Sequence, residues 1–340
     1  MKKVKLSLTR GLSVDFIDRE VALKRVEEWA ERGMVVVHMV FGPEGCGKSA
    51  WLRQSAELLR ELGFDVLYVN PLQREYIAYI DLKEVVKRFA EAAAARTGIA
   101  EIKLADLAVQ MAIYAIKKRR RKIAVLADDV FQAIGLDKAA SYVKWMLGVI
   151  EYPPGEYERI VAVAATSEGL TRREIGRHMW ADHYPMWNMS REGFRQLYDQ
   201  IPGHKPPFED VWRLTGGNPR LLGQLYEAGW DVDKVVEMFM RGKELNSPDL
   251  SRWRGWLEKA LEDPDVLWTV EAPEGLLDRL VERNLVVHNL HDRDPSFWVD
   301  APPPERDPEL GVGKYVAWQT PLHREAVRRA LGSSSPPRLS

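Results

Sequence analysis

The feature that most constrains the fold is the stretch from residue 35 to residue 54, which reads VVVHMVFGPEGCGKSAWLRQ. An apolar, β-branched run leads into a glycine-rich turn, and a helical pattern follows the turn. The chain fills the fixed positions of the phosphate-binding pattern G-x-x-x-x-G-K-[ST] with Gly42, Gly47, Lys48 and Ser49. A strand, this turn and a helix in that order predict a parallel α/β domain built around a phosphate-binding loop.

Each fixed position of the loop has a chemical task. Glycines reach positive φ angles and let phosphate oxygens approach backbone N–H groups. The unpaired amides and the dipole at the start of the following helix also favour an anion. We expect Lys48 to reach the β- and γ-phosphates and the Ser49 hydroxyl to complete a Mg²⁺ shell. Cys46 fills a variable position, and the alternative for the whole segment is an ordinary glycine-rich turn between a strand and a helix.

Strand-like and helical segments alternate along the first half of the chain, as a parallel sheet requires. We expect strands at residues 35–41, 65–70, 122–128 and 157–166, with a shorter fifth at 183–189. Helical patterns cover residues 82–97 and 105–118. The sequence therefore predicts an α/β core over residues 1–185.

A further helix is expected before the first strand, in FIDREVALKRVEEWAERG. One apolar face is formed by Ala22, Leu23, Val26, Trp29 and Ala30. Asp18 is the expected N-cap, and Gly33 is expected to end the helix.

The segment KIAVLADDV is an apolar strand that ends in Asp128 and Asp129. The first carboxylate is suited to hold Mg²⁺ through water, and the second to orient or deprotonate an attacking water. A strand ending in a carboxylate turn is the alternative. Because a strand at residues 65–70 intervenes between this segment and the loop, the layout indicates an additional-strand ATPase.

The segment RIVAVAATSEGLTRREIGRH ends its strand in Thr166 and Ser167, whose hydroxyls are suited to sense a γ-phosphate or its water. Thr171 and Glu174 fit a capping box for the helix that follows. Three arginines come next in this helix, and solvated surface positions are favoured for them over an arginine finger: Arg172, Arg173 and Arg177.

The segment VWRLTGGNPRLLGQLYEAG contains a well-formed helix start. Asn218 is the expected cap and Pro219 the first helical residue, after a glycine pair that supplies the turn. A well-started helix without any functional role is one interpretation of this segment. The functional one places Arg220 on the first turn of a lid helix, aimed at the nucleotide.

Taken in order, these motifs resemble the archaeal ATPase family of the STAND/AAA+ branch of P-loop proteins, which is related to archaeal origin-recognition ATPases. The segments that carry the resemblance are FIDRE at 16–20, GPEGCGKS at 42–49, VLADDVFQAIG at 125–135, ATSEG at 165–169, WNMSREGFRQLY at 187–198 and LTGGNPRLL at 214–222. The resemblance covers about residues 12–230.

The resemblance implies a role for each matching position. It implies that residues 16–20 line the adenine pocket, that Asp128 serves Mg²⁺ and that Asp129 is the catalytic acidic residue, the carboxylate that acts on the attacking water. It also implies a sensor 1 position at Thr166 or Ser167 and a sensor 2-like contact from Arg220. The full set of residues expected to contact the nucleotide is Phe16, Arg19, Gly42, Pro43, Glu44, Gly45, Cys46, Gly47, Lys48, Ser49, Ala50 and Pro219.

The chain departs from the family pattern in two places. Many AAA+ enzymes carry glutamate where this chain has Asp129, and a side chain one methylene shorter predicts slow hydrolysis. The family's trans-acting arginine has no assigned counterpart here, so the oligomeric state is not predicted.

The last third of the chain changes in composition. A lid is expected over residues 186–245 and a winged-helix-like domain, implied by the resemblance, over 246–332, followed by a disordered tail at 333–340. Residues 241–340 contain 14 Lys and Arg against 17 Asp and Glu, which disfavours strong DNA binding. The basic run KKRRRK at 117–122 is suited to phosphates, but a helix end followed by a solvated loop is favoured.

The composition, with one cysteine among 340 residues and no apolar run of membrane-spanning length, favours a cytoplasmic protein without a disulfide framework. We expect an ATP- and Mg²⁺-dependent ATPase with slow turnover that acts as a nucleotide-driven switch on a DNA or protein partner. The alternatives are a nucleotide-binding module with negligible turnover and a small-molecule kinase. The expected partners are ATP or ADP and a protein client, with weak nucleic-acid binding and no membrane.

Overall fold

The computed structural model describes residues 3–96, 98–167, 169, 174–176, 178–290 and 293–332. The chain divides into two compact units. The first contains residues 19–41 and 48–185 together with the start of the chain. The second contains residues 5–18, 42–47 and the chain from residue 186 onward.

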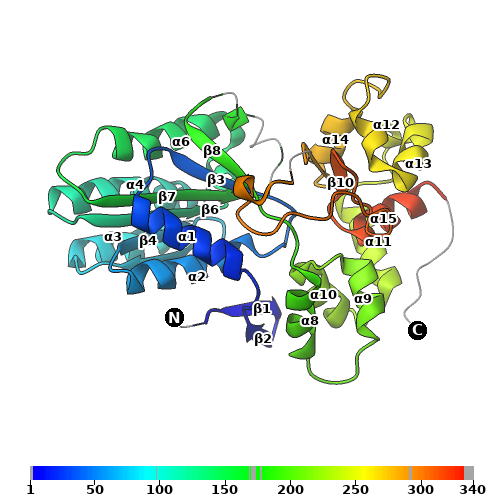
Figure 1. Cartoon of the computed structure of the whole chain (residues 1–340), viewed down its shortest axis with the longest axis horizontal. Helices are drawn as coiled ribbons and strands as arrows, with labels where there is room; N and C mark the ends of the chain where they lie inside the picture. Colours follow the sequence, from blue (N-terminus) through cyan, green and yellow to red (C-terminus); the bar gives the residue numbers. More distant parts are fainter. Residues whose placement is uncertain are drawn as a thin grey trace. The chain divides into compact units, whose positions relative to one another are not determined.

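The first unit is built on a six-stranded sheet in the order β5-β4-β6-β7-β3-β8 (Figure 1). All neighbouring strands are parallel except β5, which pairs antiparallel with β4 at one edge. The strands are β3 (Val37–Phe41), β4 (Asp65–Asn70), β5 (Glu75–Tyr79), β6 (Lys122–Asp128), β7 (Arg159–Thr166) and β8 (Ala181–Pro185). Four strands of this sheet lie within or at the expected segments, and the fifth lies at 181–185 where 183–189 was expected. The edge strand β5 was not expected.

The strand order confirms the additional-strand α/β fold. The strand that lies between β3, which leads into the glycine-rich loop, and β6, which ends in Asp128, is β7. The segment at 65–70 separates the two motifs only along the chain, because β4 pairs with the opposite side of β6. The register places Asp128 beside Ala165 and Thr166 beside Phe41, so the polar strand ends meet at one edge of the sheet.

Helices cover both faces of this sheet (Figure 1). On one face α1 (Glu20–Arg32) packs on α2 (Lys48–Glu61), and Trp29 contacts both His38 of β3 and Trp51. The opposite face is covered by α3 (Lys83–Ala93), α4 (Ile99–Lys117), α5 (Val130–Ile134) and α6 (Leu136–Glu151). Alternate strand residues, such as Ile123 and Val125 of β6, pack into the cluster beneath this second group, as a two-residue side-chain period requires.

The expected start of α1 is wrong in one respect. The residue that precedes the helix is Arg19, in a left-handed conformation with φ of 88° and no side-chain cap. Within the second unit, the Asp18 carboxylate instead accepts a hydrogen bond from the Ser190 backbone N–H at 3.0 Å. A long-range donor has therefore taken the acceptor that a local N-cap would have used. Gly33 ends the helix as expected.

The second unit is mainly helical. It begins with a hairpin of β1 (Lys5–Thr9) and β2 (Leu12–Asp15). Its helices are α8 (Arg191–Asp199), α9 (Phe208–Thr215), α10 (Pro219–Glu227), α11 (Val232–Gly242), α12 (Pro248–Ser251), α13 (Arg254–Glu262), α14 (Leu276–Glu282) and α15 (Pro321–Ala330), with 3₁₀ turns at η1 (Pro264–Trp268) and η2 (Pro295–Phe297). One hydrophobic cluster joins Val14 of β2, Leu222 of α10 and the buried Trp318.

Near the end of the chain, α13 and α14 precede a short antiparallel pair, β9 (Val286–His288) and β10 (Val316–Trp318). This order of elements is the one on which the winged-helix prediction depends. The expected disordered tail at 333–340 lies outside the described residues.

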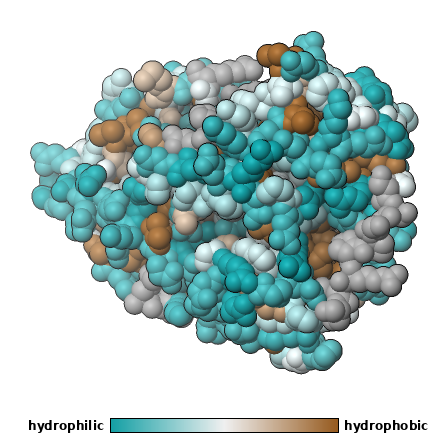
Figure 2. Space-filling view, turned by 45° about the vertical axis from the view of Figure 1, so that its right-hand side comes forward, coloured by the Kyte–Doolittle hydropathy of each residue, from teal (hydrophilic) through white to brown (hydrophobic). Residues whose placement is uncertain are grey.

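The surface shown in Figure 2 is largely hydrophilic, with apolar residues in small separate groups, as is normal for a folded domain. Among the described residues, no helix combines the length and the apolar character needed to cross a bilayer.

Candidate functional site

The glycine-rich loop at 42–47 connects β3 to α2, and its glycines are needed for two separate reasons. Gly45 and Gly47 have φ angles of 77° and 105°, which L side chains rarely adopt. Gly42 and Gly45 also lie against other backbone and side-chain atoms. A Cβ at Gly42 would lie 1.9 Å from the Met186 carbonyl oxygen, and one at Gly45 would lie 2.3 Å from Cβ of Arg220. The loop therefore tolerates no side chain at these positions.

Lys48 and Ser49 begin α2 directly after the loop. Their place in the first turn puts them beside backbone N–H groups that have no partner within the helix. Lys48 is buried and Ser49 is half-buried. A buried cation followed by a hydroxyl at a helix N-terminus is suited to bind phosphate.

Asp128, at the end of β6, is a buried carboxylate that accepts hydrogen bonds from several side chains of the first unit. Its Oδ2 atom accepts hydrogen bonds from the Tyr68 hydroxyl at 3.0 Å and from Asn70 Nδ2 at 2.9 Å. The Ser49 hydroxyl hydrogen-bonds to the same carboxyl group. Burial, and then the negative charge of Asp129, raises the pKa of Asp128 to about 6. The structure thus brings together Ser49 and Asp128, the two residues expected to serve Mg²⁺.

The donor set around Asp128 fits Mg²⁺ of the kind that accompanies nucleotides. Mg²⁺ is commonly held by one or two carboxylates, with waters and substrate phosphates as the other ligands. In the described part of the chain, His, Cys, Asp and Glu nowhere form a group of three or more that is suited to a metal. A cation at Asp128 and Ser49 would therefore draw its remaining oxygens from water and phosphate. The raised pKa of Asp128 also suits a site that a cation would complete.

Tyr68 and Asn70 were missed in the sequence. They occupy alternate positions of β4, so their side chains lie on the same face of the sheet, and both are fully buried. A polar residue at the carboxyl end of an otherwise apolar strand was the available signal. The pairing of β4 with β6 could not be read from that signal, and it is this pairing that brings both side chains to Asp128.

Asp129 lies one residue beyond the strand in a left-handed conformation, with φ of 49°. Its backbone N–H donates to the Ala165 carbonyl oxygen at 3.2 Å. Its half-buried side chain makes no capping hydrogen bond to α5. Asp128 and Asp129 therefore have different environments, the first enclosed by donors and the second closer to solvent.

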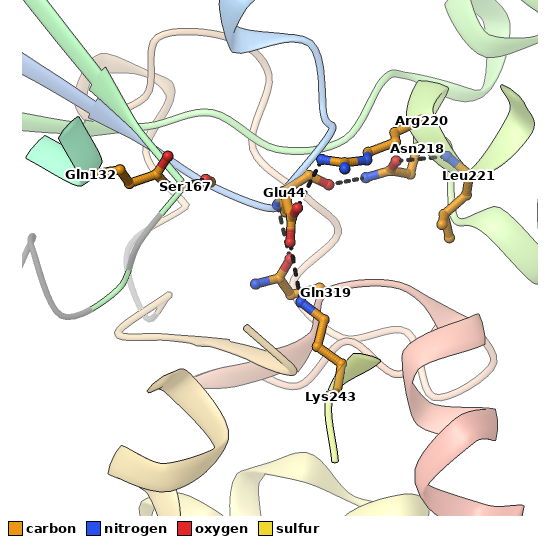
Figure 3. A network of polar contacts seen from close by, with 8 residues as sticks. All are labelled: Glu44, Gln132, Ser167, Asn218, Arg220, Leu221, Lys243 and Gln319. Carbon is orange, nitrogen blue, oxygen red and sulfur yellow. Dashed lines mark hydrogen bonds and ion pairs between the residues drawn. The ribbon is translucent and has the colours of Figure 1, made fainter. Parts of the chain in front are cut away.

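Thr166 and Ser167 end the neighbouring strand β7. Thr166 is buried, and Ser167 Oγ accepts a hydrogen bond from Gln132 Nε2 of α5 at 3.4 Å (Figure 3). The predicted capping box depends on Thr171, which lies outside the described residues. The same holds for the three arginines considered there, Arg172, Arg173 and Arg177.

Glu44, in the loop, is the centre of a polar network within the second unit (Figure 3). Its carboxylate accepts from Arg220 Nη1 at 2.8 Å and from Lys243 Nζ at 3.2 Å. Burial tends to raise the pKa of Glu44, but attraction to Lys243 and Arg220 outweighs it and lowers that pKa. Glu44 and Arg220 are among the expected site residues, whereas no sequence pattern pointed to Lys243.

The backbone of Glu44 is bound as well. Its N–H donates to Gln319 Oε1 at 2.8 Å, and its carbonyl accepts from Asn218 Nδ2 at 2.9 Å. Asn218 also caps α10 by accepting from the Leu221 N–H at 3.2 Å, with Pro219 at the first helical position as expected. The loop apex is therefore held by side chains from distant parts of the sequence.

The remaining expected contact residues are mostly buried. Phe16 lies in the second unit and Arg19 in the first, and neither has appreciable exposed surface. Cys46 is a buried free thiol whose Sγ donates to the Met186 carbonyl oxygen at 3.8 Å. Three others are buried as well: Pro43, Ala50 and Pro219.

A protein family described as an ATPase domain predominantly from Archaea matches residues 16–225 of this chain. No curated protein sequence matches it. Among solved structures, the ORC2 protein of Aeropyrum pernix in ADPNP–ADP complexes is similar at 14% identity and a TM-score of 0.40, over 93% of this chain and 92% of that one. Cdc6p of Pyrobaculum aerophilum is similar at 12% identity and a TM-score of 0.38, over 97% and 99%. The replication initiator DnaA bound to AMPPCP and single-stranded DNA has 13% identity and a TM-score of 0.37, over 75% and 72%.

Proposed function

The chain belongs to the family of ATPase domains found predominantly in Archaea, and from this premise we propose that it hydrolyses ATP slowly with Mg²⁺ and uses the nucleotide state to switch a partner. In this proposal the loop and the start of α2 bind the phosphates. Lys48 neutralises phosphate charge, while Ser49 and Asp128 hold the cation. A bound Mg²⁺ would supply charge neutralisation on the β- and γ-phosphates.

The observation that carries the proposal is the hydrogen-bonded group of Ser49 and Asp128. The hydroxyl comes from the phosphate-binding motif and the carboxylate from a strand 79 positions later, yet the two side chains bond to one another. Tyr68 and Asn70 fix the orientation of the carboxylate. Burying an ionisable carboxyl group costs stability even when hydrogen-bond donors surround it. A cation-binding role would explain why the chain places Asp128 there.

Asp129 is the residue we propose to orient the attacking water. Its half-buried side chain follows Asp128 directly and does not cap α5. Because aspartate is one methylene shorter than glutamate, we expect water to be placed less well and turnover to be slow. Thr166 or Ser167 would report on the γ-phosphate, and Arg220 would contact it from the lid at 186–245.

The proposed partner is a protein client, with weak binding to nucleic acid at most. In the winged-helix-like domain proposed for 246–332, 16 acidic residues outnumber 11 basic ones. The run at 117–122 is partly neutralised, because Arg120 lies 3.4 Å from Asp65 and Arg121 lies 3.3 Å from Glu158. Paired cations contribute little to phosphate binding.

One experiment separates this function from a kinase and from a binding module without turnover. Phosphate release is measured with ATP and Mg²⁺, with no added acceptor, with and without duplex DNA, on protein whose native mass is determined in parallel. Release that requires Mg²⁺ supports the ATPase. Release only when a small-molecule acceptor is added would indicate a kinase, and tight binding without any release would indicate a binding module.

A further inference from the structure

We infer that Glu44 is a specificity-determining residue of the nucleotide site, because its carboxylate and the γ-phosphate of ATP compete for the Arg220 guanidinium. ADP lacks that phosphate and leaves Arg220 with Glu44. The strength of the pair between Glu44 and Arg220 would then set how strongly the protein prefers ATP to ADP. This inference rests on the proposed ATP-binding function and adds a residue to it.

The carboxylate of Glu44 is an anion placed inside a loop whose sequence is built to receive anions. It is held by two cations that come from different elements, Arg220 in the first turn of α10 and Lys243 just after α11. Both cations lower the pKa of Glu44, so the group is ionised at neutral pH. The Glu44 carboxylate therefore already neutralises part of the positive charge that would otherwise attract a triphosphate.

The loop backbone around Glu44 is fixed by residues from elsewhere in the second unit. The N–H of Glu44 donates to Gln319, and its carbonyl accepts from Asn218 (Figure 3). The next carbonyl, that of Gly45, accepts from the Arg220 N–H at 3.4 Å. The α10 terminus approaches so closely that Gly45 has no room for a side chain. Glu44 therefore remains beside Arg220 when the loop is filled, and competition rather than withdrawal is expected.

The exposure of the two cationic side chains indicates which ion pair with Glu44 breaks when ATP binds. The Arg220 side chain is 57% exposed, whereas that of Lys243 is only 19% exposed. Arginine offers a planar fork that suits phosphate, and Nη1 is the nitrogen that bonds Glu44. We therefore expect Arg220 to turn from Glu44 to the γ-phosphate, while Lys243 stays on the carboxylate.

The test compares the affinities for ADPNP and ADP, measured by titration calorimetry with Mg²⁺ on the full chain. Glu44→Gln keeps the shape of the side chain and removes the competing charge, so it should raise the ADPNP/ADP affinity ratio by about tenfold. The matched control is Glu237→Gln, an exposed partner of Arg241 on α11 at 3.5 Å, which should leave the ratio unchanged. In an Arg220→Met background, Glu44→Gln should have no effect on the ratio.

Two results would overturn the inference. One is a Glu44→Gln variant whose ADPNP/ADP ratio is unchanged or lower while both ligands still bind. The other is an Arg220→Met variant that retains the wild-type ratio, which tests the same point without altering Glu44. If the wild-type protein bound neither nucleotide, the proposed function itself would fail, and that outcome is distinct from both.

Discussion

Replacing Asp128 with asparagine should make the protein more stable in the absence of ligands and at the same time remove the proposed Mg²⁺-dependent turnover. The side chain is fully buried at the end of β6, and its pKa is raised from 3.8 to about 6. The ionised form is therefore the one that the folded state disfavours. A residue that weakens the fold in this way is expected where function needs an unfavourable charge, as in the proposed cation-binding role of Asp128.

The magnitude follows from the shift in pKa. A rise from 3.8 to about 6 corresponds to about 3 kcal/mol of lost stability once the group is ionised in both states. Since the folded carboxyl keeps its proton to higher pH than the unfolded one, the stability contribution of Asp128 falls as pH rises from about 4 to about 6 and is constant above. The advantage of Asp128→Asn should thus be about 3 kcal/mol at pH 8 and about half of that at pH 5. The new amide N–H₂ needs an acceptor such as Ser49 Oγ, so these values are upper limits.

Thermal unfolding in EDTA at the two pH values measures this difference. About 3 kcal/mol corresponds to a rise in Tm of about 6–12 °C for a unit of this size. The control is Glu91→Gln on α3, an exposed residue 3.8 Å from Lys87, which should change stability by less than about 0.5 kcal/mol. A variant no more stable than the wild type at pH 8, or with the same advantage at both pH values, would refute the reasoning. Phosphate release should fall by at least about a hundredfold.

The other predictions concern the phosphate site, the water and the partner. Lys48→Ala should weaken ATP binding by about 10- to 100-fold, because it removes a charge-assisted contact in a preformed anion site, and unchanged binding by calorimetry would contradict a phosphate-binding loop. Asp129→Asn should keep ATP affinity within about threefold and lower turnover by about 10²–10⁴-fold, the usual contribution of general-base catalysis. If turnover survives, the water is positioned by another residue such as Ser167. Neutralising residues 117–121 with Gln and Ser should reduce any weak, salt-sensitive binding of a fluorescent duplex more than deleting residues 246–340 does. The reverse order at two salt concentrations would show that the C-terminal region reads DNA.

Where the sequence was misleading, a long-range contact had replaced a local one. Asp18 is a good N-cap by residue type, but the Ser190 N–H takes its carboxylate and Arg19 precedes the helix instead. The edge strand β5 was not predicted, because its residues are only half-buried. It is recognised as a strand through its antiparallel pairing with β4, which the sequence of the segment does not reveal.

The sequence by itself determined the phosphate-binding loop, the strand that ends in Asp128 and the cap of α10 at Asn218, because each depends on residues that are neighbours along the chain. The tertiary structure alone decided which strand lies between β3 and β6, and it brought Tyr68 and Asn70 to the Asp128 carboxylate. It also decided the partners of Glu44, which come from as far as 275 positions away. No periodicity or spacing encodes such pairs, because they arise only when strand register and helix packing fix which side chains meet.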